Sequence, residues 1–278
     1  MSRHVVAPEG LTPNAKMTLN VENKSQLNKE LPLTLSHYQI DDYLTCPLKY
    51  KFIHILRVPI YKNHAIIYGS AMHQAIAAYL TARVSNDSFS LNDLLLVLEK
   101  GWKSEGYLSR EHEEQRLSAG RLALQKFYEK EEQSDHRPTS VEKDFSFFFE
   151  GVKIKGRFDR LDQMGETVND GIIIDYKTSE VSNQKEADKK ARESEQLDLY
   201  AWAYREKNGV LPKAVHLYFL DSEIIGTDVK EEKDIDKMKE KVQKAANGIR
   251  MSNFAARPTY IACRYCPYQE ICPYTQSS

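Results

Sequence analysis

The sequence predicts an α/β fold in which helices come first and a mixed sheet flanked by helices follows. Apolar residues recur every three or four positions through most of residues 35–132, which is typical of amphipathic helices. From about residue 140 they recur at every second position, which indicates strands. A continuous apolar run, Ile172–Ile174, suits a strand that is buried on both faces of a sheet.

Residues 1–33 are polar and carry no sustained periodicity. We expect a flexible leader or linker there, or equally the remnant of a tag, and a single folded domain over 34–278. A helix is expected from about Leu35, with Ser36 as its N-cap, and it should end at Pro47.

Apolar residues at helical spacing then predict three further helices, over 68–83, 91–104 and 111–132. The sheet should begin with two alternating strands, 140–149 and 152–161, joined by a turn at Glu150 and Gly151. The remaining elements are expected as a strand leading to Lys177, a long helix over 186–207, two strands over 215–219 and 223–229, and a charged helix over 231–249.

The composition is that of a soluble globular protein, with 41% hydrophobic and 28% charged residues in a chain of 278. We find neither a long apolar run for a membrane span nor a signal peptide, so a cytoplasmic location is expected. The net charge is -1, which is not the basic balance of a protein that holds nucleic acid by charge alone. A nucleic-acid role would therefore depend on local charge and bound cations.

Two acidic residues and a lysine suggest a metal site at the end of the apolar strand. Asp175 and Lys177 are two residues apart, so they point to the same side of a strand. Such a triplet alone is common by chance, and taken alone it favours a surface ion pair. Asp159 follows the preceding strand, and antiparallel pairing would bring the two carboxylates together. A divalent cation between them would relieve their repulsion.

His73 and a helical pair extend this constellation. His73 follows Gly69 at the start of a helix, and a neutral imidazole can ligate a metal, although a buried core histidine is the more frequent case. Gln196 and Tyr200 are four residues apart and lie on one helix face, where they could support the site or belong to an ordinary amphipathic helix.

The four cysteines indicate a second metal site. Cys263, Cys266 and Cys272 form a C-x2-C-x5-C cluster near the C-terminus, and Cys46 lies more than 200 residues away. Because disulfides are disfavoured in a cytosolic chain, a metal site is the better interpretation. Four thiolates suit zinc or a [4Fe–4S] cluster.

Together these motifs resemble the RecB-type branch of the PD-(D/E)XK nucleases. The order is Gly-x-x-x-His from Gly69, Gly-x-x-Asp from Gly156, an apolar strand ending in Asp-Tyr-Lys at Lys177, and Gln-x-x-x-Tyr from Gln196. This branch contains the nuclease domains of RecB and AddAB, nucleases fused to UvrD-like helicases, and CRISPR adaptation nucleases. The resemblance covers about residues 35–275 and implies a restriction-endonuclease-like fold.

The resemblance also implies roles for these residues. His73, Asp159, Asp175 and the carbonyl of Tyr176 would hold Mg²⁺ or Mn²⁺, Lys177 would be the catalytic lysine, and Gln196 and Tyr200 would lie beside the site. Glu142 is a further carboxylate on the strand before, and we do not include it in the predicted ligand set. The cysteines, Cys46, Cys263, Cys266 and Cys272, would form the iron–sulfur staple of AddB-type nucleases, so that a [4Fe–4S] cluster is favoured over zinc or free thiols.

The resemblance implies a DNA nuclease, expected to be an exonuclease on single-stranded DNA or DNA ends in repair or recombination. The alternatives are a silent nuclease-like module that binds DNA or a helicase, and a zinc-stapled structural protein. The chain has no Walker A motif, so any unwinding would come from a UvrD-like helicase in cis or in trans. No membrane partner is expected.

Overall fold

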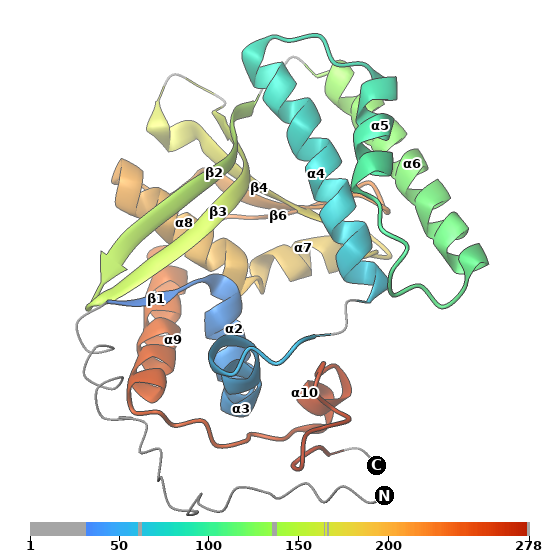
Figure 1. Cartoon of the computed structure of the whole chain (residues 1–278). Helices are drawn as coiled ribbons and strands as arrows, with labels where there is room; N and C mark the ends of the chain where they lie inside the picture. Colours follow the sequence, from blue (N-terminus) through green and yellow to red (C-terminus); the bar gives the residue numbers. More distant parts are fainter. Residues whose placement is uncertain (1–31, 61–62, 135–137, 164, 166, 277–278) are drawn as a thin grey trace, which may run out of the picture.

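The computed structural model describes residues 32–60, 63–134, 138–163, 165 and 167–276 (Figure 1). Its centre is a six-stranded mixed sheet. β2 pairs along one edge of β3, and β1 and β4 pair with the two ends of its other edge. β5 pairs with β4, and β6 pairs with β5. The strands are β1 (Leu33–Leu35), β2 (Pro138–Phe149), β3 (Val152–Gln163), β4 (Gly171–Lys177), β5 (Ala214–Phe219) and β6 (Ile224–Asp228).

The β2–β3 hairpin is closed by a two-residue turn. Glu150 and Gly151 have φ angles of +46° and +71°, the left-handed conformation that a tight hairpin turn of this kind needs at both positions. Phe149 pairs with Val152 directly beside the turn, and the same register continues along the hairpin as far as Ser140 and Leu161. The turn therefore fixes which residues of β2 and β3 face each other.

Helices cover both faces of the sheet (Figure 1). The helical elements are α2 (His37–Thr45), α3 (Pro47–Tyr50), the π-helical turn η1 (Lys51–Ile55), α4 (His64–Ser85), α5 (Leu91–Gly101), α6 (Arg110–Glu132), the 3₁₀ turn η2 (Val168–Asp170), α7 (Gln184–Arg192), α8 (Glu195–Asn208), α9 (Glu232–Arg250) and α10 (Tyr260–Arg264). Among them, none combines the length and hydropathy that a membrane-crossing segment needs.

The core has two parts, one on each face of the sheet. On one face α4, α5 and α6 pack around Tyr176 and Tyr218. On the other face α2, α8 and α9 pack against the apolar side of β1, β3, β4 and β5. Trp202 of α8 lies at the centre of this second part, where Phe147 and Phe149 of β2 contact its ring edge to face.

The mixed sheet flanked by helices is confirmed, and three elements differ from the prediction. The single helix expected over 186–207 is two helices, α7 and α8, because Ser194 caps a new helix by accepting a hydrogen bond from the backbone N–H of Leu197. Leu33, expected within the leader, already belongs to β1, and the rest of the predicted leader up to residue 31 lies outside the described residues. After Pro47 the chain stays helical through α3 and η1.

Candidate active site

The candidate site lies at a gap in the sheet along one edge of β3. β1 pairs with β3 at Val152–Ile154 and β4 pairs with it at Arg160–Gln163, so no described strand lies beside residues 155–159 on that edge. β1 leads directly into α2, and β4 ends at Lys177. A pocket opens in this gap and is lined by residues of α2, α4, β2, β3, β4 and α8.

Three acidic residues follow one another across β2, β3 and β4 at this gap. The β2–β3 register places Glu142 opposite Asp159. The β3–β4 register, continued by one residue, places Asp159 opposite Asp175. Neighbouring strands are about 4.8 Å apart, so this arrangement concentrates negative charge in one small volume.

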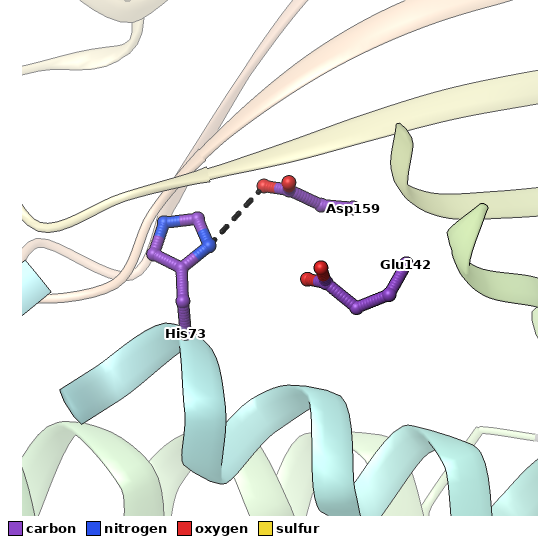
Figure 2. Close-up of side chains that lie close together, drawn as sticks. All are labelled: His73, Glu142 and Asp159. Carbon is purple, nitrogen blue, oxygen red and sulfur yellow. Dashed lines mark ion pairs between the residues drawn. The ribbon is translucent and has the colours of Figure 1, made fainter. Parts of the chain in front are cut away.

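His73 approaches the acidic row from α4. Its Nδ1 lies 3.4 Å from Asp159 Oδ2, and its Nε2 lies 3.0 Å from the carbonyl oxygen of Tyr176. One ligand atom each from His73, Glu142 and Asp159 lie within 4.8 Å of one another (Figure 2). Within the described part of the chain this is the one group of three or more histidine, cysteine or acidic side chains that meets this spacing.

Tyr176 organises the site through its backbone. Its N–H donates to Asp159 Oδ2 at 3.0 Å, while its carbonyl oxygen faces His73. Its side chain points to the other face of the sheet, where the buried Arg160 donates to the hydroxyl at 3.3 Å. Arg160 is also paired with Glu131 at 2.7 Å and with Asp162 at 2.6 Å, so an ion network on the far face holds the strand that carries the site.

Asp175 and Lys177 form a second group in the same pocket. Lys177 Nζ lies 2.6 Å from Asp175 Oδ2 and donates to Gln196 Oε1 at 2.8 Å. Gln196 Nε2 donates to Asp175 Oδ1 at 2.7 Å and to the Tyr200 hydroxyl at 2.8 Å. The four side chains thus fix one another's positions, with Asp175 buried and Lys177 partly exposed at the pocket surface.

Burial and crowding shape the ionisation of the site. Burial, followed by the charge of Asp175, raises the pKa of Asp159 to about 8, against the opposing hydrogen bond from Tyr176. Burial favours the neutral amine of Lys177, but the adjacent Asp175 carboxylate holds the pKa of Lys177 above its ordinary value. Without a bound cation, Asp159 therefore carries a proton at neutral pH, and Lys177 is charged.

All predicted active-site residues lie in this pocket, but they divide into two groups. His73 and Asp159 lie together, while the oxygens of Asp175 bind Lys177 and Gln196. Glu142, outside the predicted ligand set, completes the group around His73. Sequence reasoning also missed His37 and Tyr38 at the start of α2, which line the pocket. They lie there because β1 pairs with β3 and leads directly into α2 beside the gap.

The four cysteines line a single separate pocket between α3 and the C-terminal tail. The backbone N–H of Arg257 donates to Cys46 Sγ at 3.4 Å, and burial raises the pKa of Cys266. No three of the four Sγ atoms lie within 4.8 Å of one another.

A family model described as the PD-(D/E)XK nuclease superfamily matches residues 34–273. No curated protein matches significantly. Among solved structures, SSO0001 is 13% identical with a TM-score of 0.42, covering 91% of this chain and 93% of that one. A protein from Eubacterium rectale described as a "Putative exonuclease" is 10% identical with a TM-score of 0.46, covering 89% and 90%.

Proposed function

The chain belongs to the PD-(D/E)XK nuclease superfamily, and on this basis we propose that it is a divalent-metal-dependent deoxyribonuclease of the RecB-type branch. We propose further that it is an exonuclease on single-stranded DNA or DNA ends. The observation that carries the proposal is the cluster of His73, Glu142 and Asp159 beside the Asp175–Lys177 pair, in a gap of the sheet that leaves room for a substrate.

The donor atoms fit Mg²⁺ or Mn²⁺. Hard divalent cations prefer carboxylate oxygens, and Mn²⁺ also accepts an imidazole. Burial and the nearby Asp175 raise the pKa of Asp159, and a cation bound beside this carboxyl would stabilise its charged form. We therefore propose His73, Glu142 and Asp159 as ligands, together with the carbonyl of Tyr176 and with Asp175 on the adjacent strand. A bound divalent ion supplies Lewis-acid activation of a phosphodiester and a more acidic water.

The chain's own residues then have distinct roles. Lys177 places an ammonium group at the pocket surface, where it neutralises charge that develops on the phosphate. Gln196 holds both the ammonium group and Asp175 by hydrogen bonds. Burial raises the pKa of Tyr200, so its hydroxyl stays neutral and keeps Gln196 in place. We propose that Lys177 is catalytic and that Gln196 and Tyr200 are positioning residues.

The cysteine pocket is proposed to hold a [4Fe–4S] cluster. Its four thiols come from both ends of the described chain and line one pocket, and four thiolates are a donor set that suits such a cluster. Such a cluster would close the domain that we propose spans 34–278. A visible absorbance band, with iron and acid-labile sulfide in the anaerobically purified protein, is the expected result. A colourless protein with stoichiometric zinc would contradict this assignment.

The biological partner is proposed to be DNA, with a UvrD-like helicase acting in cis or in trans. The proposed function is tested by incubating 5′- and 3′-labelled single and double strands with Mg²⁺ or Mn²⁺, beside Asp175→Ala. We expect metal-dependent cleavage by the wild type and at least about a 100-fold loss in the variant. If no strand is cut with either metal, the chain is instead a nuclease-like binding module.

A further inference from the structure

One face of the β2–β3 hairpin carries a series of cross-strand pairs that leads away from the acidic cluster. Beyond Glu142 and Asp159, the register pairs Asp144 with Arg157, Ser146 with Lys155, and Phe148 with Lys153. Side chains two residues apart share a face of a strand, so all these pairs are on the same side. The opposite side packs into the core through Phe145, Phe147, Val152, Ile154 and Phe158.

The outer part of this face is open to solvent. Ser146 and Lys155 are exposed, and Phe148 keeps 65% of its surface exposed. The hairpin extends away from α4, α5 and α6 toward β1 and α9 (Figure 1), so none of the first three helices covers its tip. An exposed aromatic ring beside lysines on one strand face has the chemistry of a surface that binds single-stranded nucleic acid.

The charges on this face are unequal along its length. Arg157 is neutralised, because its Nε lies 2.7 Å from Asp144 Oδ1 and its Nη1 lies 3.2 Å from Glu142 Oε2. Lys153 and Lys155 have no acidic partner within 4.0 Å anywhere in the described chain. The outer two pairs therefore present two uncompensated cations in a protein whose net charge is -1.

We propose that this surface, made of Ser146, Phe148, Lys153 and Lys155 and called the hairpin track, binds single-stranded DNA that enters the active site. The proposal rests on the nuclease function proposed above. Lys155 and Lys153 are on alternate residues, about 6.6 Å apart along the strand, which is close to the distance between neighbouring phosphates of an extended single strand. Each cross-strand pair then accommodates one nucleotide, and Phe148 stacks on a base at the far end.

The exposed aromatic side chain selects a single strand over a duplex. A ring on a flat sheet face can stack only on a base whose own face is free. Lysines paired with phosphates supply binding that is independent of sequence and sensitive to salt. The track therefore fits a single strand of any sequence, held along about three nucleotides on one side of the scissile bond.

The test compares Lys153→Ala/Lys155→Ala and Phe148→Ala with a matched control, Lys207→Ala/Lys244→Ala, which removes exposed lysines of α8 and α9. Binding of fluorescent dodecathymidylate is measured in EDTA over a range of salt concentrations. We expect the track double variant to bind about 10-fold more weakly and its salt slope to fall by about 1.4, for two phosphates on a single strand. Phe148→Ala should weaken binding about 5-fold or more at an unchanged salt slope.

Activity assays distinguish an effect on the hairpin track from an effect on the active site. With Mg²⁺, Phe148→Ala, at a residue outside the active-site pocket, should raise KM for oligonucleotides while kcat and the hydrolysis of bis(p-nitrophenyl) phosphate stay at wild-type values. For the wild type, KM should fall as the substrate lengthens to about three nucleotides on one side of the scissile bond, and the track double variant should lose this dependence.

The outcomes distinguish the two proposals. If the wild type cuts DNA and both track variants bind and cut DNA as the wild type does, the proposed binding role of the hairpin track is wrong and the nuclease function stands. If the wild type cuts no DNA and the salt slope of DNA binding is still lower in the double variant, the nuclease function is wrong and the hairpin track is supported as a binding surface. A duplex that binds as tightly as the single strand, with no effect of Phe148→Ala, would overturn the single-strand assignment.

Discussion

Lys177 is the residue on which the proposed chemistry depends most directly. It contacts Asp175 and Gln196, and a charged ammonium group has no lone pair with which to ligate a metal ion. Lys177→Met should therefore lower kcat by about 100-fold or more, since charge stabilisation is lost. Mn²⁺ affinity should not fall, because every proposed ligand remains and the substitution removes an ammonium group that competes with the metal ion for Asp175.

Cleavage assays and calorimetric Mn²⁺ titration measure the two effects separately. Lys185→Met on the exposed side of α7 is the matched control, and thermal melting checks that the variant is folded. An equal kcat in Lys177→Met and in the control would show that Lys177 is not catalytic.

Asp159 links metal uptake to pH. Its pKa of about 8, raised by burial and by Asp175, means that a divalent ion must displace a proton below that pH. Metal affinity should accordingly increase as the pH rises toward about 8 and level off above it. In the metal-free protein, the stabilising effect of the protonated carboxyl is complete below its ordinary pKa near 4 and is lost as the pH rises through 8.

Chemical denaturation in EDTA between pH 5 and 9 measures the stability effect. For the wild type the free energy of unfolding should fall with pH by at most about 1.4 kcal/mol per unit from this group. Asp159→Asn should remove that part of the slope and also abolish stabilisation by Mn²⁺. A variant that keeps the wild-type slope would assign the titration to another group.

At the scale of elements, the network around Arg160 joins α6 to β3 and β4 behind the site. Arg160 is 4% exposed and pairs with Glu131 and Asp162, which are also buried. Arg160→Met would leave two buried carboxylates without their cation, which costs about 3–5 kcal/mol of stability. It would also release the Tyr176 hydroxyl, so Mn²⁺ affinity should fall although Arg160 lies outside the pocket.

Urea denaturation and Mn²⁺ titration well below the melting temperature test this prediction, with the exposed Arg110→Met on α6 as the control. Lost stability with unchanged Mn²⁺ affinity would mean that the network supports the fold but does not position Tyr176.

The elements that the sequence predicts well are those with local signals. The β2–β3 hairpin follows from alternation and from the Glu150–Gly151 turn. Glu142 could also have been found there, because the two-residue turn pairs Phe149 with Val152. Seven positions farther from the turn on each strand, Glu142 lies opposite Asp159. The break between α7 and α8 was missed because the helical pattern of apolar residues continues through it, although the capping Ser194 marked it.

Non-local pairing limits the rest of the prediction. β1 has only three residues and is held by parallel pairing with β3, far along the chain. Nothing near Leu35 indicates that partner, so the placement of His37 and Tyr38 in the pocket could not be derived from the local pattern. The motifs identified the site's members, but the division between the His73 group and the Lys177 group depends on side-chain geometry.

At the scale of the whole molecule, the two ends of the described chain meet beside the cysteines. The Tyr43 hydroxyl donates to the carbonyl of Asn253 at 2.7 Å, and the Tyr268 hydroxyl donates to the carbonyl of Val58 at 2.8 Å. The Arg257 side chain donates to the carbonyl of Leu44 at 2.8 Å. The segment that these contacts hold includes α2, whose first residues line the active-site pocket.

The proposed cluster should therefore stabilise the domain and, through α2, the site. A link between Cys46 and the C-terminal cysteines closes a loop of more than 200 residues, and a cross-link over a loop that long contributes about 5 kcal/mol in the chain-entropy description. Cys46→Ser and Cys266→Ser should each lose the visible absorbance, melt well below the wild type, and lose nuclease activity at temperatures where the wild type is active. Tyr268→Phe removes one hydrogen bond between the same segments and leaves all thiols in place, so it should keep the absorbance and lose only about 1 kcal/mol. Wild type and cysteine variants that melt together and are equally colourless would show that the thiols hold no metal, and that the contacts of the tail alone position α2.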